Sequence, residues 1–213
     1  MLLNSKKGVF ITFEGGEGAG KTTLINALSH ELASQGHQVV KTREPGGTPF
    51  GEKIRAWLLD PQVSTPMTPK TELLMFLAAR AQHLEEIIAP ALSQGKVVLC
   101  DRFNDSTIAY QGGGRQLGIP YVSNLCKEVC GKILPDVTFF LDIEIHEGLT
   151  RTKQAEKEWK EDRMETQEHL FHQRVLDTFR LLAKQEPQRI FLLNAQKSKE
   201  QVFKEALIFL QKI

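Results

Sequence analysis

The stretch FITFEGGEGAGKTT, residues 10–23, decides the fold of this chain. An apolar run suited to a buried strand leads into a loop with four glycines, and a predicted helix follows. Residues 15–22 fit the pattern GxxxxGKT, in which glycines let successive backbone N–H groups converge on phosphate oxygens and the helix adds its positive end. Because the pattern stands between a strand and a helix, the sequence predicts a P-loop that binds a nucleoside triphosphate.

The P-loop pattern gives individual residues their roles. Lys21 would reach the β- and γ-phosphates, and Thr22 would hold magnesium through its hydroxyl. As a phosphate ligand, Lys21 is expected to be exposed. Glu17 is unusual, because a carboxylate inside a phosphate cradle would repel its ligand, so it either points away or serves another group. The predicted triphosphate-binding residues are Gly15, Gly16, Glu17, Gly18, Ala19, Gly20, Lys21, Thr22 and Thr23.

Composition predicts one ordinary globular domain. The 213 residues carry a formal net charge of +1, which gives no reason to expect a nucleic-acid polymer or an acidic membrane as partner. Three cysteines favour buried thiols over a disulfide framework. The first residues are charged too early for a signal peptide, and no apolar run reaches 18 residues. We therefore expect a soluble cytoplasmic protein.

Strand-like and helix-like segments alternate along the chain. The predicted strands are 9–14, 38–42, 97–101, 137–142 and 189–193, and most are continuously apolar, as strands buried on both faces are. The predicted helices are 21–35, 69–94, 121–131, 163–185 and 198–211. This order predicts an α/β fold in which helices flank a five-stranded parallel sheet. The charged, weakly periodic segment 146–163 predicts a small mobile lid on a single domain.

A second site is predicted where the strand 97–101 ends. Ligands of open parallel sheets collect at the carboxyl ends of strands, and Asp101 and Arg102 stand there. Arg102 has the planar fork that suits a phosphate, and Asp101 could bind magnesium. A structural ion pair is the alternative. A helix beginning near residue 106 would place three further side chains on one face: Thr107, Tyr110 and Gln111.

Two more segments carry polar side chains that suggest a ligand. Arg80 falls within the apolar stripe of the helix 69–94 and needs a buried partner or a polar ligand. With Phe76 one turn earlier it could seat a planar base that has carbonyl oxygens; a core Phe with a snorkelling Arg is the alternative. Thr48 could cap a helix that carries Arg55 toward the same crevice as Arg102.

The class of nucleotide protein follows from what accompanies the P-loop. The sequence has no Asn-Lys-x-Asp guanine reader, and large ATPases need more chain, so a small kinase is favoured. Together the residues resemble the thymidylate kinase family, P-loop nucleoside monophosphate kinases that phosphorylate dTMP. The motifs FEGGEGAGKTT, TREPGGT, FLAARAQH and DRFNDSTIAYQGGGR occur in this order over nearly the whole chain. The acidic Glu17 in the loop is similar to that of the bacterial type.

The resemblance implies ATP as co-substrate, magnesium, dTMP as acceptor and a homodimer. Phe76 would stack on thymine, Arg80 would bond a thymine carbonyl, Tyr110 would crowd the 2′ position of the sugar, and Glu17 would meet the 3′-hydroxyl. The implied dTMP residues are Glu17, Arg55, Phe76, Arg80, Arg102, Thr107, Tyr110 and Gln111. Thr22, Asp101 and Glu44 would surround the magnesium, partly through water. The implied catalytic residues are Lys21, Asp101, Arg102, Arg151 and Lys153.

The predicted lid departs from the family pattern. Residues 151–163 read RTKQAEKEWKEDR, with five basic and four acidic residues, whereas the bacterial type has an arginine-rich lid. Arg151 and Arg163 match the flanks, and Lys153, Lys157 or another residue would reach the phosphates. A solvated charged helix is the alternative.

Two rival functions remain open at this point. A deoxynucleoside kinase would need a carboxylate base, for which Glu14 or Glu17 could serve. A regulatory module would bind nucleotide without transferring phosphate, although Lys21, Thr22 and the Asp101-Arg102 pair are all present.

Overall fold

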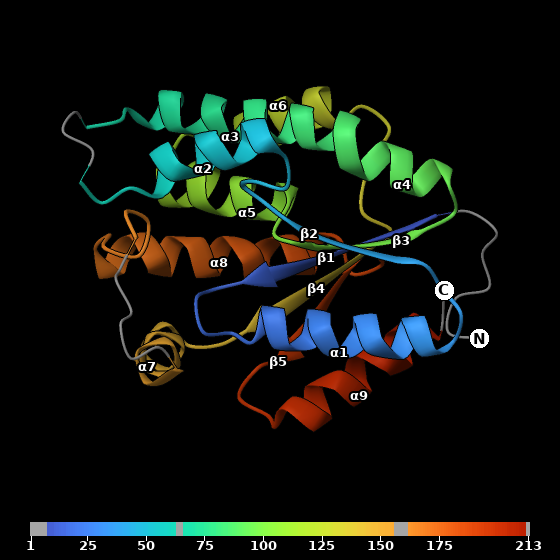
Figure 1. The fold of residues 1–213 in the computed structure, drawn as a ribbon. Coiled ribbons are helices and arrows are strands. Elements are labelled where there is room, and N and C mark those ends of the chain that lie inside the picture. Colours follow the sequence, from blue (N-terminus) through green and yellow to red (C-terminus); the bar gives the residue numbers. More distant parts are fainter. Residues whose placement is uncertain (1–7, 63–65, 156–161, 212–213) are drawn as a thin grey trace.

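The computed structural model describes residues 8–62, 66–155 and 162–211. Its five strands form one parallel sheet in the order β2-β3-β1-β4-β5 (Figure 1). The strands are β1 (Val9–Gly15), β2 (Val39–Arg43), β3 (Val97–Asp101), β4 (Val137–Asp142) and β5 (Ile190–Asn194). Each lies within one residue of its predicted bounds. Continuous apolar runs mark β1, β3 and β4, which are buried on both faces, whereas the edge strands β2 and β5 are only partly buried.

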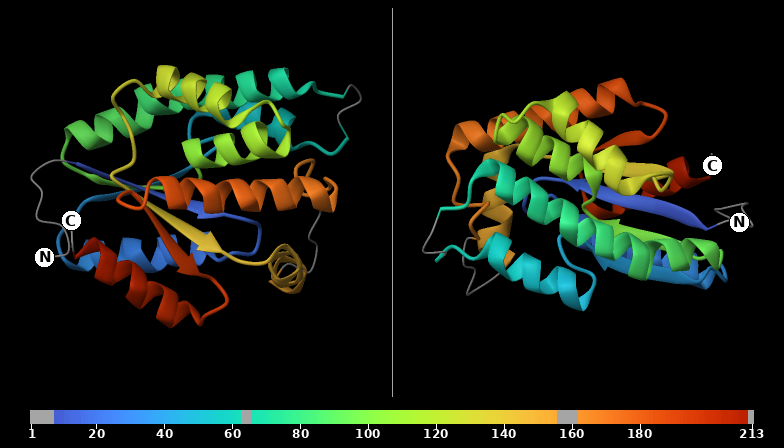
Figure 2. Two further views of the ribbon diagram at one scale, coloured as in Figure 1. Left: turned by 180° about the vertical axis from the view of Figure 1, so that it is seen from behind. Right: turned by 90° about the horizontal axis from the view of Figure 1, so that it is seen from above.

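Helices cover both faces of the sheet. On one face lie α1 (Lys21–Ser34) and α9 (Lys199–Leu210), whose apolar side chains join those of β1 and β4 in the largest core cluster (Figure 2). On the other face, α4 (Ala89–Ser93) contacts β3, α5 (Asn104–Thr107) contacts β1 and α8 (His169–Gln185) contacts β4. The helices α2 (Pro49–Leu59), α3 (Pro69–His83) and α6 (Ile119–Cys130) form a further layer above them (Figure 1).

Two predicted helices differ in detail from the observed ones. The segment 69–94 is helical almost throughout but contains a π-helical turn, Leu84–Ile88, just before Pro90, which has no N–H for the regular ladder. The segment 163–185 becomes helical only at His169. Arg163 instead donates from its backbone N–H to Leu59 and from Nε to Leu58, satisfying carbonyls at the end of α2.

Part of the predicted lid is a helix, α7 (Ile145–Ala155). Residues 156–161, which include the lid candidate Lys157, lie outside the described residues. A second π-helical segment, Ile108–Gly114, continues α5 and includes three consecutive glycines, Gly112, Gly113 and Gly114.

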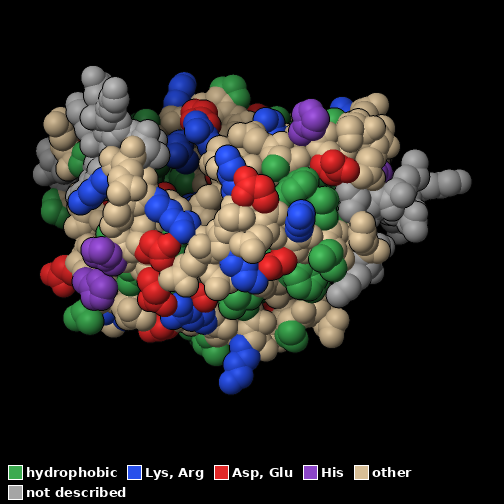
Figure 3. Space-filling model, turned by 90° about the horizontal axis from the view of Figure 1, so that it is seen from below, with side chains coloured by type: hydrophobic (Ala, Val, Ile, Leu, Met, Phe, Trp, Pro, Cys, Tyr) green, Lys and Arg blue, Asp and Glu red, His purple; other side chains and the backbone are tan. Residues whose placement is uncertain are grey.

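Other expectations from composition can be compared with the structure. All three cysteines are buried and free, as predicted. Within the described ranges, no helix is long and apolar enough to cross a membrane. On the face seen from below in Figure 3, Lys and Arg side chains are interspersed with Asp and Glu, which agrees with a net charge close to zero.

Candidate active site

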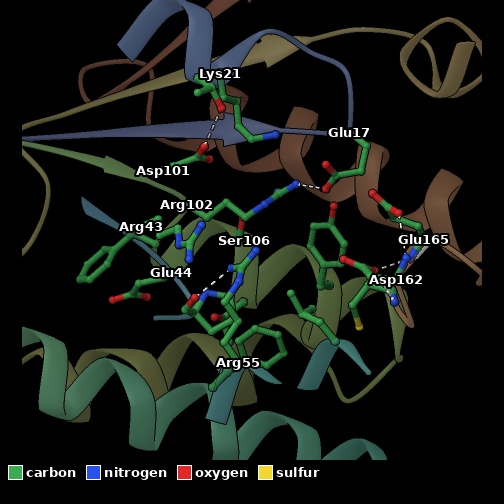
Figure 4. A pocket seen from close by; sticks show the side chains of 18 of the residues that line it. Glu17, Lys21, Arg43, Glu44, Arg55, Asp101, Arg102, Ser106, Asp162 and Glu165 are labelled. Atoms are coloured by element: carbon green, nitrogen blue, oxygen red, sulfur yellow. Dashed lines mark hydrogen bonds and ion pairs between the residues drawn. The ribbon is translucent and has the colours of Figure 1, made fainter. Parts of the chain in front are cut away.

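One cavity of about 640 Å³ lies at the carboxyl edge of the sheet. The P-loop follows β1, Asp101 ends β3 and Glu44 follows β2, so the parallel topology brings all three to this edge. Figure 4 shows Arg102 between the end that holds Lys21 and Asp101 and the opposite end, from which Arg55 reaches inward. The volume is within the usual range for a small-molecule site.

The P-loop backbone is shaped by glycine and packs directly against α7. Gly18 and Gly20 adopt φ angles of 65° and 92°, in the left-handed region that glycine tolerates best. A Cβ at Gly18 would lie 2.0 Å from the Gly148 carbonyl oxygen, and a Cβ at Gly148 would lie 2.3 Å from the Glu17 carbonyl oxygen. The two glycines therefore allow α7 to lie directly against the loop.

Lys21 corrects one expectation, because its side chain is only 7% exposed. The side chain folds back over the loop, and Nζ donates to the carbonyl oxygens of Gly15 at 3.3 Å and Gly16 at 2.8 Å. Burial, followed by the nearby Arg102, lowers the pKa of Lys21. The ammonium nevertheless lines the cavity.

Thr22 and Asp101 meet at the end of the cavity predicted for magnesium. Thr22 Oγ1 donates to Asp101 Oδ2 at 3.4 Å, while Asp101 Oδ1 is buried and has no hydrogen-bond partner within the described part of the chain. An open carboxylate oxygen beside a hydroxyl fits the oxygen ligands that Mg²⁺ prefers. In the described segments, no group of three or more His, Cys, Asp or Glu side chains forms a metal site, so phosphate oxygens and water would complete the coordination.

Arg102 connects the P-loop to the opposite wall of the cavity. It has φ of 66°, an unusual value for a residue other than glycine, and this turns its side chain back across the end of β1. Nη1 donates to the Gly15 carbonyl oxygen at 2.8 Å and to Ser106 Oγ at 3.3 Å, and Nη2 pairs with the Glu17 carboxylate. Although burial opposes the charge of Glu17, Arg102 and Lys21 lower its pKa to about 2. Glu17 thus faces Arg102 and lines the cavity.

Arg80 is fully enclosed, so the snorkelling alternative is wrong. Its side chain is 1% exposed. Nε donates to Glu44 Oε2 at 2.7 Å and Nη2 to Thr107 Oγ1 at 2.9 Å, and the guanidinium lies over the Phe103 ring. Arg80 nevertheless lines the cavity together with Phe76.

The structure brings most of the other predicted residues to the same cavity. Arg55, whose Nη1 donates to the Pro45 carbonyl oxygen at 2.9 Å, lines it, and so do Tyr110 and Gln111. Thr48 Oγ1 accepts from the Gly51 N–H and caps α2, as predicted. Among the described residues of α7, Arg151 and Thr152 line the cavity, whereas Lys153 is exposed and does not.

Sequence reasoning missed one wall of the cavity. Asp162, Met164 and Glu165 line it from a single turn that precedes α8, and Arg43 lines it from the end of β2. Asp162 Oδ1 accepts from the Met164 and Glu165 N–H groups, and Glu165 Oε2 accepts from the Asp162 N–H. This reciprocal pattern is that of a capping box, and the spacing D-x-x-E is its sequence signal.

A parallel sheet with a P-loop after its first strand, and a cavity that runs from the loop to a second basic wall, are the features of a P-loop nucleotide kinase. The sequence model of one family, thymidylate kinase, matches residues 13–206. The chain is 50% identical to a thymidylate kinase of Protochlamydia amoebophila, with 96% of this chain and 93% of that protein aligned. It is 49% identical to a thymidylate kinase of Geobacter sulfurreducens, with 88% and 89% aligned.

The fold is also similar to the crystal structure of thymidylate kinase from Ehrlichia chaffeensis. The TM-score is 0.77 at 35% identity, and the match covers 96% of this chain and 99% of that one. The chain belongs to the thymidylate kinase family.

Proposed function

We propose that this protein transfers the γ-phosphoryl group of ATP to the phosphate of dTMP, which yields ADP and dTDP. The observation that carries the proposal is one continuous cavity, lined by Lys21 and Thr22 at the P-loop end and by Phe76, Arg80 and Thr107 at the other. Family membership supports the same reaction.

For this reaction the protein has to align the two phosphate groups and to neutralise their negative charge. A phosphate monoester has its second pKa at about 6, so at neutral pH the acceptor phosphate is largely dianionic and can attack without a general base. Its oxygen forms the bond to the γ-phosphorus while the bond to the β–γ bridging oxygen breaks. Lys21 and Arg102, together with Arg151, are the cations that would hold the two anionic groups in line.

Magnesium would be held by Thr22 and the open oxygen of Asp101, and when bound it would shield the charge of the phosphates. Glu44 would contribute only through water, because both of its carboxylate oxygens already accept hydrogen bonds from protein groups. Lys153 remains the predicted lid cation beside Arg151, although Arg151 has the better support because it lines the cavity.

The residues that line the cavity opposite the P-loop are the ones proposed to bind dTMP. We propose that Phe76 stacks on the thymine, that Arg80 and Thr107 bond its edge, and that Arg55 and Arg102 hold the phosphate. Gln111 would belong to the base side: its Oε1 is buried and has no partner among the residues that the structure describes. Tyr110 would crowd the 2′ position, and Glu17 would meet the 3′-hydroxyl.

The rival deoxynucleoside kinase has weaker support. Glu14, one of its candidate bases, is fully buried, accepts from the Phe103 N–H at 2.8 Å and from Ser106, and does not line the cavity. Glu17, the other candidate, is paired with Arg102.

A coupled assay that offers ATP with dTMP, dUMP, dCMP and thymidine in parallel tests the proposal. We expect turnover with dTMP above the other three. Turnover of thymidine alone would overturn the assignment, and tight nucleotide binding without any transfer would favour the regulatory module instead.

We also propose a homodimer in the cytoplasm. Large apolar side chains are exposed on α2 and α3: Phe50 at 50%, Trp57 at 62% and Leu74 at 60%. Light scattering should give the mass of two chains, and Trp57→Lys should give the mass of one. A monomeric wild-type protein at micromolar concentration would contradict the proposal.

A further inference from the structure

Glu44 is bound at both of its carboxylate oxygens in the wall of the cavity. Arg80 Nε donates to Oε2 at 2.7 Å, and His83 Nδ1 lies 2.9 Å from Oε1. The side chains of Arg80 and His83 are 1% and 0% exposed, and that of Glu44 is 4% exposed. Because only a small part of this carboxylate is exposed, loss of the donor at one oxygen is expected to shift the carboxylate and so change the hydrogen bond at the other.

The second ring nitrogen of His83 is also occupied. His83 Nε2 lies 2.6 Å from Thr42 Oγ1 at the end of β2. A neutral ring with its proton on Nδ1 serves both partners, because it donates to the carboxylate and accepts from the Thr42 hydroxyl. A Cβ at Gly47 would lie 2.6 Å from His83 Nε2 and 2.8 Å from Thr42 Oγ1, so the backbone of the following turn covers this bond.

We infer that His83 is a positioning residue for acceptor recognition, because it fixes through Glu44 the guanidinium of Arg80 that reads the base. The inference rests on the proposed function, in which Arg80 bonds the thymine. His83 does not line the cavity, whereas Glu44 and Arg80 do, so its effect on the acceptor must pass through them.

Loss of the His83 imidazole would change the orientation of the Arg80 guanidinium. Without it, Glu44 Oε1 would be a buried carboxylate oxygen with no donor, which is among the costlier defects in a protein interior. The carboxylate would turn toward another donor and take Oε2 away from Arg80 Nε. Thr107 and Phe103 hold the rest of the guanidinium, so we expect a tilt of Arg80 and not its release. A tilted fork loses its alignment with a base edge.

The test compares two substitutions of the same residue in the full-length protein. His83→Leu fills similar space but removes both hydrogen bonds, whereas His83→Asn keeps an amide donor near the position of Nδ1. We expect His83→Leu to raise KM for dTMP roughly 10-fold, the size of a lost hydrogen bond to a charged group, with KM for ATP and kcat changed by less than about twofold. His83→Asn should recover most of the loss.

Two further variants separate positioning from general destabilisation. Thr12→Val removes the fully buried bond between Thr12 and Thr138, 2.7 Å long, and should lower Tm with no change in KM for dTMP. Thr42→Val keeps its shape, removes only the donor to His83 and should raise KM for dTMP about threefold, which tests the inference even if His83→Leu does not fold.

Unchanged KM for dTMP in His83→Leu or Thr42→Val, or an equal rise for ATP and dTMP, would overturn the inference. Wild-type protein in the same assay keeps the two proposals apart: if it fails to phosphorylate dTMP, the proposed function itself is wrong. If it succeeds and the His83 variants behave like wild type, only the positioning role is wrong.

Discussion

Replacement of Gly148 by alanine should move α7 away from the P-loop. The added Cβ would lie 2.3 Å from the carbonyl oxygen of Glu17. The oxygen is a backbone atom and the Cβ is bonded directly to the backbone, so rotation of a side chain cannot relieve the clash. To reach even 3.0 Å, α7 must move by about 0.7 Å away from the loop. Gly148 and Arg151 both belong to α7, so Arg151 would move with the helix. Because Arg151 lines the cavity, this movement would change the active site.

The expected effect is large on activity and small on stability. A displacement of about 1 Å at a reacting centre can cost ~100-fold in rate, so we expect kcat/KM for ATP to fall roughly 10- to 100-fold. Alanine in place of glycine stabilises a helix by up to ~1 kcal/mol, while overpacking costs about 1–3 kcal/mol, so the two effects partly cancel in the free energy of unfolding. Binding of dTMP measured by calorimetry should change less than twofold.

The control uses an exposed position on the same helix. Gln154 is exposed, so a comparison of Gln154→Gly with Gln154→Ala measures the intrinsic gain of alanine at a solvent-facing position of α7. Steady-state kinetics and urea denaturation of all three variants then give the cost of the contact itself. Wild-type kcat/KM for ATP in Gly148→Ala would refute the reasoning that α7 must rest on the P-loop.

Three further predictions follow from buried charges. Lys21→Ala should abolish turnover while far-UV CD and Tm remain near wild type, because the hydrogen bonds of Nζ to described residues go to its own loop, and the Gly15 oxygen keeps its bond from Arg102; a lost fold would contradict this. Arg80→Ala should weaken dTMP binding selectively but also lower the free energy of unfolding by about 3–5 kcal/mol in urea denaturation, since Glu44 is left buried without its cation; a loss below ~1 kcal/mol would contradict the pairing. Burial, and next the charge of Asp105, raises the pKa of Glu14 to about 7. The stability gained because the folded protein keeps Glu14 protonated is therefore fully present below pH 4.5 and is lost as the pH rises to about 7. The free energy of unfolding should therefore fall by about 3 kcal/mol across this window in wild type and not in Glu14→Gln, and a fall of equal size in the variant would refute it.

The sheet and the P-loop could be predicted from sequence because their signals are local. Continuous apolar runs predicted the strand bounds to within one residue. The P-loop could be predicted from its glycine spacing, because its conformation depends on the backbone of the loop itself. The acceptor wall could be predicted in part, because Arg80 stood out as a charge in an apolar stripe. Its partner could not be assigned, since Glu44 lies 36 residues away and reaches Arg80 only once β2 and α3 are packed.

The remaining differences have the same tertiary origin. The segment from Arg163 has a helical pattern and a capping box, yet only one turn forms before His169, because Arg163 bonds to the end of α2 and pairs with the buried Glu72 at 2.7 Å. That interruption brings Asp162 and Glu165 to the cavity. Lys21 is buried for a comparable reason: a long side chain beside unsatisfied loop carbonyls folds back onto them.

A single carbonyl at the end of β1 links the two halves of the cavity. The Gly15 oxygen accepts hydrogen bonds from Lys21 Nζ at 3.3 Å and from Arg102 Nη1 at 2.8 Å. The cation proposed for the triphosphate and the cation proposed for dTMP therefore bind the same carbonyl oxygen. The two charges repel each other, and Arg102 lowers the pKa of Lys21. Glu17, paired with Arg102 and close enough to Lys21 for each to shift the pKa of the other, offsets this repulsion. An acid in the phosphate loop is thus explained by geometry: it offsets the repulsion between two cations that, in the proposed reaction, would hold the two phosphates.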